Sequence, residues 1–169
     1  MTDVHKRVSK GLPLWYNHNM KQYKIYLDVC CLNRPFDDQG QDRIHLESEA
    51  VLSIIGHIRN AEWFLLGSDA IDDEISRIPD DDKRVKVGIL AGMHAKHVSI
   101  NDTIKERSRE LYKMGFKPLD AVHIACAEHG HADILLTTDD ALLAKAARHR
   151  KKIQVSIANP LQWALEVIS

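Results

Sequence analysis

Cysteine is scarce in this chain of 169 residues and follows no cross-linking or metal-binding pattern. The three cysteines are Cys30, Cys31 and Cys126, an odd number with two of them adjacent, and no CxxC pair occurs. This spacing argues against a disulfide framework and against a zinc ribbon. We therefore expect reduced thiols, buried as small apolar side chains, in a cytoplasmic protein.

Long apolar runs and an excess of one charge are also missing. No run approaches the roughly 20 residues that span a bilayer, so we expect no membrane segment. The formal net charge is −1, so any binding to nucleic acid must come from a local patch. Neither a GxSxG motif nor a Walker A loop is present, which removes two common kinds of catalytic site.

The length suits one domain with one core. The stretch MTDVHKRVSKGLPLWYNHNMKQY has no signal-peptide core and no clear periodicity. We interpret residues 1–22 as an N-terminal extension outside the core and residues 23–169 as the domain. Our hypothesis is that Met20 is the natural start and that residues 1–19 are an extension outside the fold.

Short apolar segments alternate with segments of helical periodicity. Strands are predicted at residues 23–29, 63–66, 97–100, 133–136 and 153–157. Helices are predicted at residues 43–58, 69–77, 83–94, 101–114, 118–128, 141–148 and from 160 onward. Asn101 is the expected cap of one helix, Gly115 its end, and Pro118 the start of the next. The alternation predicts an α/β protein with a parallel sheet covered on both faces.

Acidic residues gather where the predicted strands end. Asp28 ends the first strand, several acids between residues 69 and 74 follow the second, and Asp139 and Asp140 follow the fourth. Asp120 lies near the start of a helix. Because ligands of parallel sheets bind beyond the carboxyl ends of the strands, these acids are expected at the ligand-binding edge.

Each acid taken alone has an ordinary explanation as a turn or helix-capping residue. A cluster of carboxylates, however, repels itself unless a cation joins it. Oxygen ligands suit Mg²⁺ or Mn²⁺. Such an ion activates water and stabilises the oxygens of a phosphoryl transfer, so the residues indicate metal-assisted phosphodiester hydrolysis.

Four segments resemble the PIN-domain ribonucleases, which include the VapC-type toxins of bacterial toxin–antitoxin pairs. In chain order they are IYLDVCCLN, LLGSDAIDDEI, KPLDAVHIACAE and ILLTTDDALL, and the resemblance spans about Lys24 to Leu165. It implies a three-layer α/β/α sandwich with a central parallel sheet of about five strands. It also implies an endoribonuclease in which a metal-activated water cleaves RNA, leaving 5′-phosphate and 3′-hydroxyl ends.

The resemblance also implies the site residues. The catalytic residues and ligands of Mg²⁺ or Mn²⁺ are expected to be Asp28, Glu74, Asp120 and Asp139, with Asp140 as a further metal ligand. Thr137 is expected to support the site. Family members often carry Ser or Thr just after the first Asp, where this chain has Val29 and Cys30, and Asn33 is the polar residue expected to compensate.

The expected partners follow from the same reasoning. An acidic pocket repels RNA, so cations near the motifs are expected to contact its phosphates. The predicted RNA-binding residues are Arg34, Lys117, Arg148, Arg150 and Lys151. The resemblance further implies an antitoxin protein and a homodimer. None of the histidines has zinc-ligand spacing, and His123 is interpreted as a packed side chain.

Two alternative hypotheses remain open. The first is a non-catalytic PIN module that binds metal or RNA with a degenerate site. The second is a phosphatase or phosphorelay receiver in which Asp28 is the nucleophile. The phosphatase pattern requires a second Asp two residues after the first, and Cys30 stands there instead.

Overall fold

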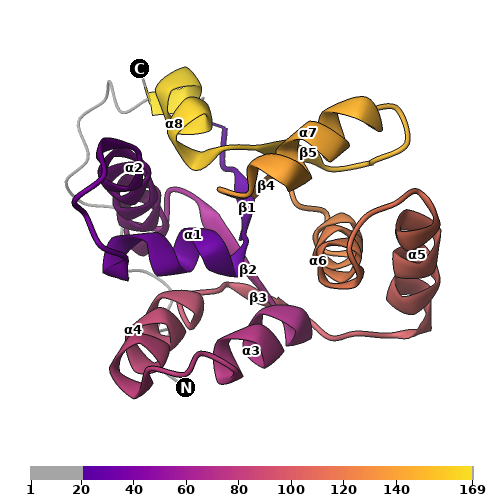
Figure 1. Cartoon of the computed structure of the whole chain (residues 1–169), viewed down its shortest axis with the longest axis horizontal. Coiled ribbons are helices and arrows are strands. Elements are labelled where there is room, and N and C mark those ends of the chain that lie inside the picture. Colours follow the sequence, from indigo (N-terminus) through magenta and orange to yellow (C-terminus); the bar gives the residue numbers. More distant parts are fainter. Residues whose placement is uncertain (1–20, 169) are drawn as a thin grey trace, which may run out of the picture.

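The computed structural model describes residues 21–168 and contains one five-stranded sheet (Figure 1). The strand order is β3-β2-β1-β4-β5, and every neighbouring pair is parallel. The strands are β1 Lys24–Leu27, β2 Phe64–Ser68, β3 Lys96–Val98, β4 Ile134–Leu136 and β5 Ser156–Ala158. The predicted parallel sheet of about five strands is therefore confirmed.

Helices connect the strands and cover both faces of the sheet. They are α1 Val29–Asn33, η1 Arg34–Phe36, α2 Asp42–Arg59, α3 Asp69–Ser76, α4 Asp81–Ala91, α5 Asp102–Lys113, α6 Pro118–His129, α7 Asp140–Arg148 and α8 Pro160–Ile168. In Figure 1, α2 and α8 lie on one side of the strands, and α5 and α6 lie on the other. This arrangement confirms the three-layer α/β/α sandwich.

The inner residues of the central strands are apolar and buried, because helices cover the strands on both sides. Ile25, Tyr26 and Leu27 of β1 are all 0% exposed, and β4 is buried throughout. Continuous apolar runs of this kind are typical of strands in a parallel sheet. The Tyr26 hydroxyl is the polar exception among these buried side chains of β1, and its partners belong to the site described below.

Local signals around α5 and α6 act as predicted. The side chain of Asn101 accepts a hydrogen bond from the backbone N–H of Ile104 and caps α5. Gly115, with φ of 95°, follows the end of that helix in a conformation that favours glycine. Pro118 is the first residue of α6, where its missing N–H has no intrahelical partner to lose.

Several predicted strand boundaries are wrong: β2 continues to Ser68, β3 ends at Val98, and the boundaries of β1 and β5 differ for a visible reason. β1 ends at Leu27, because the Asp28 carboxylate accepts the N–H of Val29 and starts α1. β5 begins only at Ser156. The N–H of Gln154 donates to the side chain of Glu128, so this part of the predicted strand makes no ladder bond there.

Our hypothesis that Met20 is the natural start concerns residues that the structure does not describe. Cys31 and Cys126 are buried, as expected, whereas Cys30 is half-buried. Within residues 21–168, no helix combines the length and apolar character needed to cross a membrane.

Candidate metal centre

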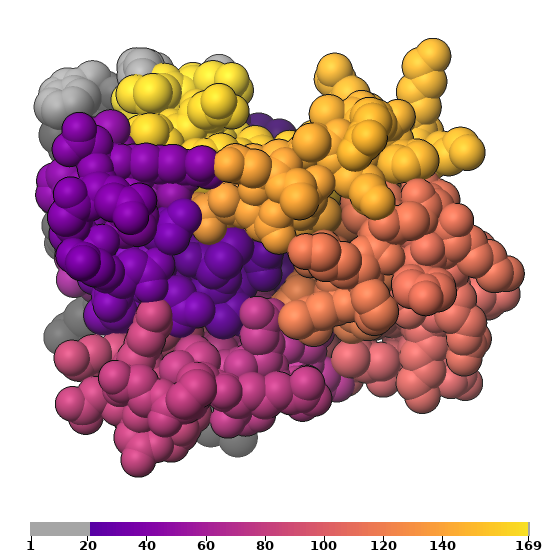
Figure 2. Space-filling view, in the orientation of Figure 1, coloured from indigo at the N-terminus to yellow at the C-terminus, as the bar shows by residue number. Residues whose placement is uncertain are grey.

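Four segments that are distant in sequence bring their acids to one edge of the sheet. Asp28 directly follows β1, Glu74 lies in α3 after β2, and Asp139 follows β4. Asp120 lies in the first turn of α6. Because β2, β1 and β4 are parallel neighbours, their carboxyl ends lie together. Figure 2 shows the indigo, magenta and orange segments meeting on one face of the molecule.

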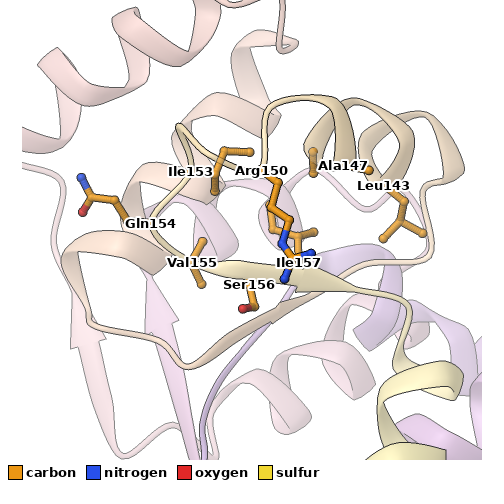
Figure 3. A pocket seen from close by; sticks show the side chains of 9 residues that line it. Leu143, Ala147, Arg150, Ile153, Gln154, Val155, Ser156 and Ile157 are labelled. Atoms are coloured by element: carbon orange, nitrogen blue, oxygen red, sulfur yellow. The ribbon is translucent and has the colours of Figure 1, made fainter.

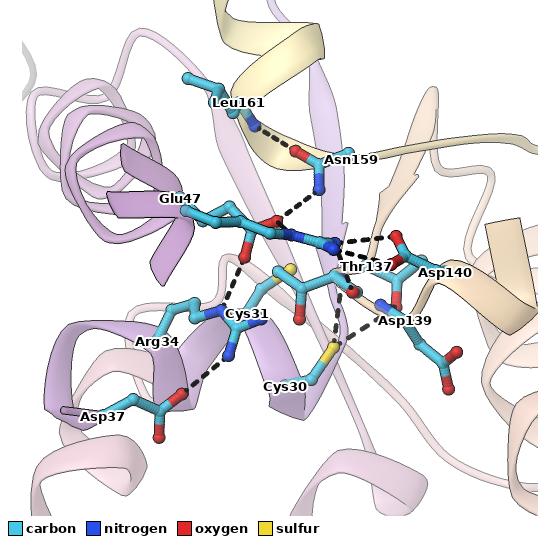
Figure 4. Close-up of polar contacts among 12 residues, drawn as sticks. Cys30, Cys31, Arg34, Asp37, Glu47, Thr137, Asp139, Asp140, Asn159 and Leu161 are labelled. Atoms are coloured by element: carbon cyan, nitrogen blue, oxygen red, sulfur yellow. Dashed lines mark hydrogen bonds and ion pairs between the residues drawn. The ribbon is translucent and has the colours of Figure 1, made fainter. Parts of the chain in front are cut away.

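The Asp28 carboxylate is buried and held by three groups. Its Oδ1 accepts the N–H of Val29 at 2.8 Å. Its Oδ2 accepts the Thr137 hydroxyl at 2.9 Å and the Cys30 thiol at 3.3 Å. The Cys30 sulfur also accepts the N–H of Thr138, and Figure 4 shows it beside Thr137. The Cys30 thiol therefore makes the contact to Asp28 that a hydroxyl after the first Asp would be expected to make.

Glu74 is connected to the core through a chain of hydrogen bonds. Its Oε2 lies 2.7 Å from Nε2 of His123, which is only 2% exposed. Nδ1 of His123 lies 2.7 Å from the Tyr26 hydroxyl, which in turn lies 2.7 Å from the hydroxyl of Ser68. His123 Nε2 also lies 3.9 Å from Oδ1 of Asp28. The imidazole thus stands between two of the predicted metal ligands.

The electrostatics of the site show that its acids interact. Burial raises the pKa of Asp120, and the negative charges of Asp28 and Asp139 raise it further. Burial lowers the pKa of His123, but the hydrogen bond to Glu74 and the charge of Asp28 outweigh this and raise it overall. Negative charge is therefore in excess at this edge, and a cation would relieve it.

The donor set fits a divalent cation. One ligand atom each from Asp28, Glu74 and His123 lies within 4.8 Å of the others. The carboxylate oxygens suit Mg²⁺ or Mn²⁺, whereas both ring nitrogens of His123 are engaged by Glu74 and Tyr26. Asp120 and Asp139 are outside this compact group; the charge of Asp120 raises the pKa of His123, and the charge of Asp139 raises the pKa of Asp120. One oxygen of Asp139, Oδ1, caps α7 by accepting two backbone N–H groups.

Two predicted residues make other contacts than expected. The carboxylate of Asp140 binds Arg43 through both oxygens, at 2.7 and 2.8 Å, and its side chain is 70% exposed. Asp140, which was predicted to bind the metal, is therefore paired with the positive charge of Arg43. Oδ1 of Asn33 is buried and has no hydrogen-bond partner among the described residues, and the contact with Asp28 comes from Cys30 instead.

The predicted RNA-binding residues lie in different settings. Arg34 pairs with Glu47 and Asp37, and its side chain is only 19% exposed. Lys117 is exposed and directly precedes α6. The exposed Arg150 lines a pocket between α7 and β5, shown in Figure 3, and the pocket contains none of the four predicted catalytic acids. The other two predicted RNA-binding residues, Arg148 and Lys151, are both exposed.

Sequence reasoning missed several of these contacts. Tyr26, Ser68 and His123 come from three separate segments, and no local pattern indicates that they meet. Arg43 and Glu47 were also missed, although their four-residue spacing on a predicted helix is a recognised signal for an ion pair. His123 is packed, as interpreted, but it also contacts a predicted catalytic residue.

Comparison with known proteins gives the family. The PIN domain family model matches residues 25–149, and the chain belongs to this family. PIN domains are generally nucleases. A comparison with curated proteins finds none that matches this chain.

One solved structure supports the fold. It is the crystal structure of VapBC2 from Rickettsia felis bound to a DNA fragment from the promoter. The sequence identity is 13%, and the match covers 80% of this chain and 98% of that chain with a TM-score of 0.50. At this identity the likeness concerns the fold alone.

Proposed function

We propose that this chain is a divalent-metal-dependent endoribonuclease that hydrolyses RNA phosphodiester bonds. The observation that carries the proposal is the meeting of four acid-bearing segments at the carboxyl edge of a PIN-domain sheet. The proposed catalytic residues are Asp28, Glu74, Asp120 and Asp139. The proposed cofactor is Mg²⁺ or Mn²⁺, which would supply an activated water and stabilise charge on the phosphate oxygens.

The residues of the chain have separate proposed roles. Asp28 and Glu74 would hold the cation in place, because the hydrogen bonds to each carboxylate limit its movement. Burial and neighbouring charges raise the pKa of Asp120, and a carboxylate with a raised pKa is suited to accept a proton from water. Thr137 would act indirectly, through its hydroxyl bond to Asp28.

The phosphatase alternative has less support. A phosphatase of this kind requires a second Asp two residues after the nucleophile, and Cys30 stands there. The chain also belongs to the PIN family. The non-catalytic alternative differs from our proposal only in turnover, so a cleavage measurement separates the two.

A role as the toxin of a toxin–antitoxin pair is a second part of the proposal. The supporting observation is the similarity in fold to a chain of the VapBC2 complex, together with membership of the PIN family. We propose an antitoxin protein as the natural partner. Co-purification with the product of an adjacent gene, and loss of nuclease activity in that complex, would be the expected results.

Two measurements on purified protein test the nuclease. Calorimetric titration with Mn²⁺ should show binding to the wild type and a loss of affinity in Asp120→Asn. Glu74→Gln should abolish cleavage of RNA while the far-ultraviolet circular dichroism spectrum stays unchanged. The matched control is Asp102→Asn, which removes an exposed acid from the first turn of α5.

The outcomes distinguish the hypotheses. Mn²⁺ binding without cleavage of any RNA tested would favour the non-catalytic module. Full cleavage activity in Glu74→Gln would show that the proposed site is wrong. Equal losses of Mn²⁺ affinity in Asp120→Asn and Asp102→Asn would show that the affinity depends on the overall negative charge and not on Asp120 itself.

A further inference from the structure

A buried carboxylate beside the acidic site holds two arginines in fixed positions. Glu47 of α2 is 1% exposed, although burying a charged carboxylate is unfavourable unless it is fully paired. It accepts Nε of Arg34 at 2.7 Å, Nε of Arg43 at 2.9 Å and the side-chain amide of Asn159 at 2.8 Å. Figure 4 shows Glu47 between Arg34 and Asn159. The carboxylate is thus satisfied from three directions.

This pairing decides where the other end of Arg43 points. A guanidinium is planar, so binding Nε to Glu47 turns the Nη1–Nη2 edge away from the protein interior. Nη2 donates to the carbonyl oxygen of Thr138 at 3.4 Å. Thr138 lies between Thr137, which binds Asp28, and Asp139. Arg43 therefore presents its outer edge directly beside the loop that carries part of the acidic site.

The outer edge of Arg43 is occupied by a solvent-exposed group. Both oxygens of Asp140 bind it, but Asp140 is 70% exposed and Arg43 is 50% exposed. An exposed pair is open to competition from another anion, although two-oxygen pairs are the stronger kind at a surface. The two-oxygen geometry is also the one in which arginine binds a phosphate. A phosphate can therefore take the place of Asp140 while the buried bond to Glu47 remains.

We propose that Arg43 binds a phosphate of the RNA backbone at the rim of the acidic site, that Glu47 positions it, and that Asp140 competes with that phosphate. The inference rests on the proposed nuclease function and identifies a substrate contact for the same site. RNA is favoured over an acidic protein segment because Arg43 adjoins the loop between Thr137 and Asp139, where a substrate phosphate must approach.

The test measures binding of a short fluorescein-labelled polyuridine at several salt concentrations. All variants carry Glu74→Gln, which prevents cleavage under the proposed function. Arg43→Gln should weaken binding about tenfold and reduce the slope of log affinity against log salt by about 0.7, the value for one phosphate on a single strand. Asp140→Asn should strengthen binding about threefold, because the competing carboxylate is gone.

Matched controls separate a specific contact from general charge. Arg59→Gln removes the same charge near the opposite end of α2 and should leave binding within about twofold of the starting protein. Arg43→Lys keeps the charge but loses the two-pronged geometry, so it should restore only part of the affinity. Equal effects of Arg43→Gln and Arg59→Gln would overturn the inference.

Three further results would also be decisive. Weaker Mn²⁺ binding in Asp140→Asn, with the original Glu74 restored, would make Asp140 a metal ligand rather than a competitor. RNA binding that is unaffected by Arg43→Gln would overturn the inference and leave an acidic protein partner as the ligand of Arg43. No binding of polyuridine by any variant at low salt would count against the proposed function as well.

Discussion

Nε2 of His123 lies 2.7 Å from Oε2 of Glu74, a proposed metal ligand. The histidine is almost fully buried, and Tyr26 holds its other ring nitrogen. Because both ring nitrogens are engaged, the imidazole has little freedom to rotate. The contact therefore connects the orientation of this proposed active-site carboxylate to the packing of β1 and α6.

Replacing His123 should impair the chemistry more than RNA binding. His123→Gln removes the ring that restrains Glu74, and supporting contacts of this kind are worth about 10–100-fold in metal affinity or activity. We expect kcat and Mn²⁺ affinity to fall by at least about tenfold, with a small change in KM. Steady-state kinetics and calorimetry would measure these effects.

Tyr26→Phe is the control for this prediction. It removes the hydroxyl between His123 and Ser68 but leaves the contact between His123 and Glu74 in place. We expect a loss of about 1 kcal/mol in the free energy of unfolding and a much smaller loss of kcat. Wild-type kcat and Mn²⁺ affinity in His123→Gln would contradict a positioning role.

The thiol of Cys30 should be replaceable by a hydroxyl but not by a methyl group. Cys30→Ser keeps a donor for Oδ2 of Asp28, so Mn²⁺ affinity should stay within about threefold of the wild type. Cys30→Ala leaves only the Thr137 hydroxyl on that oxygen, and we expect an affinity loss of about tenfold. Equal affinities of the two variants, measured by calorimetry, would show that the thiol does not support Asp28.

Glu47 should stabilise the fold at neutral pH and lose this effect in acid. Burial raises its pKa, but hydrogen bonds from Asn159, Arg43 and Arg34 outweigh burial and lower the pKa overall. A carboxyl group with a lowered pKa in the folded state stabilises the protein above its unfolded pKa of about 4.3. That contribution disappears as the pH falls through the lower, folded-state pKa.

Urea unfolding at two pH values tests this dependence. At pH near 7, Glu47→Gln should reduce the free energy of unfolding by about 3 kcal/mol, because two arginines lose their buried partner. As the pH falls below the ordinary pKa range of a glutamate, the difference should narrow because Glu47 of the wild type becomes protonated. The matched control is Glu49→Gln, an exposed site on the same helix. The same pH dependence in both variants would rule out a special contribution of Glu47.

The sequence predicted what depends on local patterns and missed what depends on packing between segments. Apolar runs such as Ile25–Leu27 and caps such as Asn101 specify their elements locally, so the sheet and most helices followed from them. The end of β1 was wrong because a capping bond from Asp28 decided it. Cys30 illustrates the limit at the site: its contact with Asp28 depends on the geometry of α1, which the sequence pattern did not indicate.

The basic stretch after α7 provides a final prediction about RNA affinity. Arg148, Arg150 and Lys151 are exposed, and none makes an ion pair among the pairs found within residues 21–168. Reversing all three charges should weaken polyuridine binding and flatten its salt dependence, because fewer counterions are released. The triple Glu variant can be compared with a reversal of three exposed cations on other helices, Arg59, Lys86 and Lys113, in the same anisotropy assay. If both variants bind equally well at low salt, the basic stretch makes no specific contribution, and phosphate binding must depend on Arg43 and the other residues closer to the acids.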